Sequence, residues 1–168
     1  MVPAILFAIS IHEYSHGMMA YRLGDPTAKY QGRLTLNPMA HLDPVGALML
    51  VLFRFGWAKP VIVNPNYFKD RRRGMLLVSL AGPLANIGVA WIFRLLLGIL
   101  PSFFSLRIGL VLRQFILLNI ALNLGLAAFN LIPIPPLDGS KILAGLLPAR
   151  YELTFHRVES YGPVLLLV

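Results

Sequence analysis

Three long apolar stretches constrain the fold of this chain more than any other feature of its sequence. They cover residues 2–21, 74–100 and 106–131, and each is close to the roughly 20 residues that a helix needs to cross a bilayer. Inside a bilayer every backbone polar group must find its partner within the protein, which favours helices for such stretches. We therefore expect an all-α polytopic membrane protein with three core transmembrane helices.

The composition supports this class and excludes others. Of the 168 residues, 57% are hydrophobic and 13% are charged, with a mean hydropathy of +0.71, whereas about a quarter of a soluble domain is charged. The net charge of +8 is typical of Lys and Arg kept in cytoplasmic loops, and no module of a nucleic-acid binder is visible. The absence of cysteine excludes disulfides and thiolate metal ligands. We expect one domain over residues 1–168, in contact with lipid.

The remaining segments predict smaller elements and a topology. Residues 31–36 alternate as in a β-strand, and residues 57–63 are placed to pair with them in a small hairpin. The apolar residues 45–55 are too few to span a bilayer, so we expect a re-entrant or interfacial segment. The basic cluster at residues 69–73 places its loop in the cytoplasm. A short helix is expected at residues 140–147. Beyond it we expect an interfacial stretch and a partial C-terminal helix, which leaves truncation at one or both ends open.

Two histidines and a glutamate lie inside the first apolar stretch, in the sequence His-Glu-Tyr-Ser-His at residues 12–16. An ionisable residue at membrane depth is costly and marks a functional site by default. On a helix, His12 and His16 share one face about 6 Å apart along the axis and can bind one zinc ion. Glu13 lies on the flank of that face, where it can act as general base toward a water on the zinc.

A catalytic zinc needs a third protein ligand, for which the sequence offers two candidates. Asp138 follows the third apolar stretch in a segment broken by prolines, and Gly139 permits close approach of its backbone. The expected topology returns it to the cytoplasmic side at the depth of His12 and His16. Asp43 is the competitor, and the ordinary role of an aspartate in such a turn is to cap the next segment. We favour Asp138.

Three motifs that follow one another along the chain resemble those of the site-2 protease family of intramembrane zinc metalloproteases. His-Glu-Tyr-Ser-His at residues 12–16 matches the first, and Ala-Gly-Pro-Leu-Ala-Asn at residues 81–86 matches another. The proline-rich stretch at residues 130–139, which ends in Leu-Asp-Gly, matches the third. The resemblance covers nearly the whole chain, and it is strongest to compact prokaryotic members without a PDZ-like or other accessory domain.

The resemblance implies one zinc ion, Glu13 as the catalytic base, and three zinc ligands: His12, His16 and Asp138. It suggests that Asn86 and Asn130 position substrate, stabilise an oxyanion or support the ligands, whereas an interhelical hydrogen bond is the ordinary role of such amides. The implied substrate is a transmembrane protein, cut within or near its membrane segment. The implied location is the prokaryotic inner membrane, and the topology predicted from the basic cluster puts the active site toward the cytoplasm.

Two other functions are weighed against this hypothesis. A non-proteolytic membrane protein that binds metal or haem would keep His12 and His16, but it would not need Glu13, Asp138 and a route for water together. A transporter would show internal repeats and polar residues along several helices, and the sequence shows neither. For His41, ordering of its own loop or a place near the access path is favoured over a metal-ligand role. The sequence does not indicate the identity of the substrate or the oligomeric state.

Overall fold

The computed structural model describes residues 1–53, 59–100 and 104–148, and these residues form helices joined by loops, with no strand among them. The helices are α1 (Val2–Arg22), α2 (Thr27–Tyr30), α3 (Pro44–Phe53), α4 (Arg71–Ile99), α5 (Leu106–Asn130) and α6 (Asp138–Leu146). Two short 3-10 turns, η1 (Pro38–Ala40) and η2 (Pro65–Tyr67), lie in the loops before α3 and α4.

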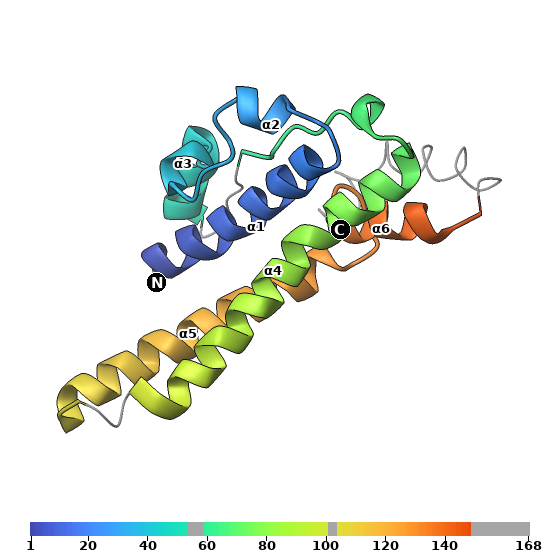
Figure 1. Ribbon diagram of the computed structural model, residues 1–168. Coiled ribbons are helices and arrows are strands. Elements are labelled where there is room, and N and C mark those ends of the chain that lie inside the picture. The colour runs from blue at the N-terminus through green and yellow to red at the C-terminus, as the bar shows by residue number, and fades with distance from the viewer. Residues whose placement is uncertain (54–58, 101–103, 149–168) are drawn as a thin grey trace.

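Helices α4 and α5 form a long pair that runs through the whole molecule (Figure 1). Both are long and apolar enough to cross a membrane. In the most apolar 18 residues of each helix, only 33% of α4 and 22% of α5 are buried within the protein. Large apolar side chains such as Trp91 and Phe115 therefore point outward. A helix that is apolar all round but not covered by protein is typical of a membrane span.

Helix α1 lies along the N-terminal half of α4 (Figure 1). Small side chains at Ala4, Ala8 and Ala20 are buried on its contact face, which lets neighbouring backbones approach closely. Its 21 residues are long enough to span a bilayer, but within the described residues only α4 and α5 are both long and apolar enough to do so. The prediction of three transmembrane helices is thus supported for α4 and α5 and stays a prediction for α1.

The predicted β-hairpin is not found in the described residues. Residues 31–36 turn instead of extending, because Gly32 has a φ of +66° and the Arg33 amide donates to the Ala28 carbonyl in α2 (2.8 Å). Burial also contradicts a strand with its leucines inward, since Arg33 is 5% exposed and Leu36 is 54% exposed. Residues 59–63 have no strand partner, and residues 57 and 58 lie outside the described part of the chain.

The short apolar segment predicted as re-entrant or interfacial forms α3, whose 10 residues are too few to span a bilayer. Asp43 precedes it and accepts a hydrogen bond from the Gly46 amide (2.8 Å), which is the capping role expected of a turn aspartate. His41 orders its loop, because its Nε2 donates to the Thr35 carbonyl (2.8 Å) and its own carbonyl accepts from the Lys59 amide (2.9 Å).

The end of the chain is described only as far as α6. This helix matches the short helix predicted at residues 140–147, and it packs against α4. The Arg72 side chain on α4 ties the two together by donating from Nε to the Gly145 carbonyl (3.0 Å). The predicted interfacial stretch and partial C-terminal helix, at residues 149–168, lie outside the described residues.

Candidate metal centre

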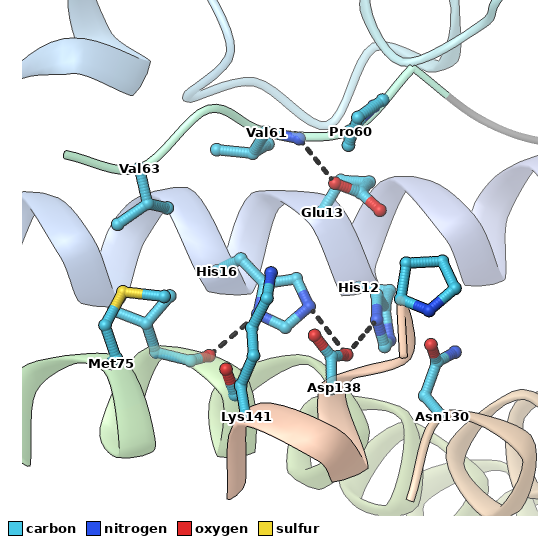
Figure 2. A pocket seen from close by; sticks show the side chains of 13 residues that line it. His12, Glu13, His16, Pro60, Val61, Val63, Met75, Asn130, Asp138 and Lys141 are labelled. Carbon is cyan, nitrogen blue, oxygen red and sulfur yellow. Dashed lines mark hydrogen bonds and ion pairs between the residues drawn. The ribbon is translucent and has the colours of Figure 1, made fainter. Parts of the chain in front are cut away.

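His12, His16 and Asp138 converge on one point where α1 meets α6 (Figure 2). Asp138 Oδ2 lies 3.0 Å from His12 Nε2 and 3.1 Å from His16 Nε2. Potential ligand atoms of the three side chains all lie within 4.8 Å of one another. The two imidazoles share one face of α1, with their ring centroids 4.6 Å apart, as the spacing of four residues predicts.

A partner on α4 holds the second ring nitrogen of each histidine. His12 Nδ1 lies 2.6 Å from Asn86 Oδ1, and His16 Nδ1 lies 2.7 Å from the carbonyl oxygen of Val78. Both oxygens accept hydrogen bonds, so each imidazole carries a proton on Nδ1 and turns Nε2 toward Asp138, the side on which a metal would bind. This arrangement is typical of histidines that bind a metal through Nε2.

Helix α4 approaches the two imidazoles closely because residue 82 is glycine. A Cβ atom at Gly82 would lie 2.5 Å from His16 Nε2 and 2.7 Å from His12 Cε1, well inside van der Waals contact. Asn86, one turn later on α4, holds His12 from the same side. The Ala-Gly-Pro-Leu-Ala-Asn motif therefore has a physical explanation, since its glycine admits the rings and its asparagine orients one of them.

The proline-broken segment after α5 brings Asp138 to the histidines as the first residue of α6. Gly139 makes this return possible, because a Cβ atom there would lie 2.3 Å from the Leu131 carbonyl oxygen. Burial tends to raise the pKa of Asp138, but hydrogen bonds from His12 and His16 outweigh it and hold that pKa well below its usual range. The carboxyl group is therefore ionised, as a metal ligand must be.

A cavity of about 210 Å³ opens beside these three residues, and Glu13 lines it with them. Glu13 is turned away from the triad, and its Oε2 accepts a hydrogen bond from the Val61 amide (2.9 Å), as Figure 2 shows. Asn130 also lines the cavity, and its Nδ2 donates to the Leu126 carbonyl within α5 (3.0 Å). The six residues predicted for the site therefore all lie in or directly behind one cavity.

Sequence reasoning missed one polar residue that lines this cavity and two buried amides on α5. Lys141 lies one turn after Asp138 on α6, and its side chain rises beside His16 into the cavity (Figure 2). Asn119 and Asn123 on α5 are 1% and 0% exposed. Their signal in the sequence is a pair of amides four residues apart in an apolar helix, which indicates a buried polar contact.

The side chains that converge here fit a zinc ion. Catalytic zinc commonly takes histidine nitrogens and a carboxylate as three protein ligands and leaves a fourth position open. Both imidazoles have the outer hydrogen-bond partners that such ligands need. In residues 1–53, 59–100 and 104–148, this is the one group of three metal-binding side chains close enough to share an ion.

Comparison with known proteins gives one consistent family. The model of peptidase family M50 matches residues 104–168. The Bacillus subtilis protein YwhC, which is named as a candidate zinc metalloprotease, is 42% identical over 100% of this chain and 78% of its own length. Rip2 of Mycobacterium tuberculosis (strain H37Rv), named in the same way, is 32% identical over 97% of this chain but only 63% of its own length. The zinc metalloprotease MJ0392 of Methanocaldococcus jannaschii is 40% identical over 49% of this chain and 23% of its own length. No solved structure matches the chain.

Proposed function

This chain belongs to peptidase family M50, the site-2 protease family, and we propose that it is an intramembrane zinc metalloprotease. Its reaction is hydrolysis of a peptide bond within or near a transmembrane segment of a membrane protein. The observation that carries the proposal is the convergence of His12, His16 and Asp138 on one point, with Glu13 in the wall of the same cavity. A protein that only stores metal or binds haem does not need this combination.

In this proposal the zinc is held by His12 and His16 through Nε2 and by the carboxylate of Asp138. When bound, the zinc polarises the scissile carbonyl and lowers the pKa of the attacking water. Glu13 accepts the proton of that water and delivers it to the leaving amine. The hydrogen bond from the Val61 amide keeps the Glu13 carboxylate at the cavity wall and out of the group of metal ligands.

Two further groups are available to the substrate carbonyl. The Lys141 side chain and the Asn130 side chain both line the cavity, and no hydrogen bond or ion pair of the Lys141 ammonium is found within the described residues. Negative charge that develops on the carbonyl oxygen is stabilised by donors fixed in advance around it. The substrate helix must unwind before its peptide bond can reach these groups, and we propose that residues 60–63 receive the extended segment through their backbone.

We also propose that the protein is a multi-pass protein of the prokaryotic inner membrane, with its site toward the cytoplasm. Exposed basic residues, Lys69, Arg71 and Arg73, lie at the beginning of α4, and such residues are enriched on the cytoplasmic side. Val78, which contacts His16, lies only about two turns further along the same helix. The cavity is therefore nearer to that membrane surface than to the opposite one.

The test is cleavage of single-span membrane proteins by the purified protein in lipid, comparing the wild type with Glu13→Gln. We expect the variant to lose at least about a hundredfold in cleavage rate, because a general base contributes that much or more, while zinc content stays the same. Ser15→Ala is a matched control on α1, since the Ser15 hydroxyl donates only to the Ile11 carbonyl of its own helix. Full cleavage by Glu13→Gln would overturn the assignment.

A further inference from the structure

We infer that Asn123 on α5 is a positioning residue that acts through Asn86 to fix which ring nitrogen of His12 faces the metal position. This inference rests on the proposed role of His12 as a zinc ligand. Asn86 and Asn123 are both 0% exposed, and they are joined across the contact between α4 and α5 by a hydrogen bond from Asn86 Nδ2 to Asn123 Oδ1 (2.8 Å). Asn123 itself does not contact the metal centre, so any effect must pass through Asn86.

The hydrogen bonds of this chain of amides run in one direction. Asn123 Nδ2 donates to the backbone carbonyl of Asn119 (2.9 Å), which leaves Asn123 Oδ1 facing α4. Asn86 Nδ2 then donates both of its hydrogens, one to Asn123 Oδ1 and the other to the Ala8 carbonyl on α1 (3.0 Å). Only Asn86 Oδ1 remains for His12, and an oxygen can only accept. His12 must therefore donate from Nδ1 (2.6 Å).

The consequence is that Nε2 of His12, and not Nδ1, is the nitrogen that faces the metal position. If the amide of Asn86 turned over, its N–H groups would face Nδ1 of His12 and would favour a proton on Nε2, where it would compete with zinc. The turned amide would also bring its oxygen against two buried acceptors, the Ala8 carbonyl and Asn123 Oδ1. Buried acceptors without a donor are costly, so Asn123 and Ala8 together hold Asn86 in the orientation that suits metal binding.

An alternative explanation is that the buried amide of Asn123 only holds helices together. A second asparagine on α5 serves as a control for this alternative. Asn119 is on the same helix and is equally buried, at 1% exposed. Its Nδ2 donates to the Phe115 carbonyl of α5 (2.9 Å), and its Oδ1 has no hydrogen-bond partner within the described residues. Its side chain therefore has no hydrogen bond that leads to the metal centre, while its burial and helix match those of Asn123.

The experiment measures zinc affinity of the purified full chain by competition with a chelator, together with its thermal unfolding. We expect Asn123→Leu to bind zinc about ten- to hundredfold more weakly, the range seen when an outer partner of a metal ligand is removed. Asn119→Leu should bind like the wild type. Asn123→Asp should recover most of the affinity, because a protonated aspartate keeps an acceptor oxygen and one donor. Asn123→Ala gives the same comparison if Asn123→Leu does not fold.

A double variant separates positioning from packing. If Asn123 acts through Asn86, adding Asn123→Leu to Asn86→Leu should cause little further loss of zinc affinity, because effects that share one partner are not additive. Wild-type affinity in Asn123→Leu, or losses that multiply in the double variant, would overturn the inference. If the wild-type chain itself bound no zinc, the proposed function would fail instead, so the two failures are distinguishable.

Discussion

Gly82 shows at the scale of one residue how closely the metal centre is packed. Since an added Cβ would lie 2.5 Å from His16 Nε2, we predict that Gly82→Ala displaces the imidazoles and lowers zinc affinity by more than about tenfold, a loss like that of an outer partner. Metal analysis of the purified protein measures this. Gly88→Ala is the matched control, because it lies on the same helix with nothing within 4 Å of its added Cβ. Equal zinc content in both variants would contradict the packing described here.

The residues of the candidate site differ in how well the sequence alone predicts them. His12 and His16 are predictable because they lie only four residues apart in the sequence. Ionisable groups inside an apolar stretch are also costly, and they therefore indicate a functional site. Asp138 follows from the shortage of other carboxylates at the right depth. The partners of Asn86 are not predictable in this way, since Asn123 and His12 lie on two other helices. Only their packing shows which atom of the Asn86 amide faces the histidine.

At the scale of elements, the backbone after α5 must fold back tightly to start α6 at Asp138. An added Cβ at Gly139 would lie 2.3 Å and 2.4 Å from the carbonyl oxygens of Leu131 and Ile132. We therefore predict that Gly139→Ala displaces α6 and abolishes both zinc binding and cleavage, although residue 139 is no ligand. Zinc content and thermal unfolding measure the effect. Gly125→Ala, whose Cβ would meet nothing within 4 Å, should behave like the wild type; a zinc loss there too would point to general destabilisation.

The long helices are predictable from the sequence to within a few residues, whereas the segment between α1 and α4 is not. Long apolar runs leave the chain few alternatives to a helix in a membrane. The alternation at residues 31–36 is short, and local turn chemistry overrides it. Gly32 takes a left-handed conformation, and the buried Arg33 side chain donates to the Ala40 carbonyl. A pattern of polar and apolar residues shows neither the conformation of Gly32 nor the hydrogen bond of Arg33.

At the scale of the whole molecule, the α4–α5 pair is the frame on which α1 and α6 meet (Figure 1). The outer surface of this pair is apolar and suits lipid, whereas its amides are buried, and the metal centre lies where α4 contacts α1 and α6. One ligand pair comes from α1, the third ligand comes from α6, and α4 supplies the hydrogen-bond acceptors for both imidazoles. The central claim is therefore that α1, α4 and α6, held together with α5, assemble one zinc site.

Zinc content per chain, compared between the wild type, Asp138→Asn and Asp43→Asn, tests this claim most directly. Asp138→Asn removes the ionised oxygen that lies 3.0 Å and 3.1 Å from the two imidazoles, whereas Asp43 only caps α3. We predict one zinc per chain in the wild type and in Asp43→Asn, and little or none in Asp138→Asn after dialysis. Undiminished zinc in Asp138→Asn would contradict the account, and loss in Asp43→Asn alone would move the third ligand there.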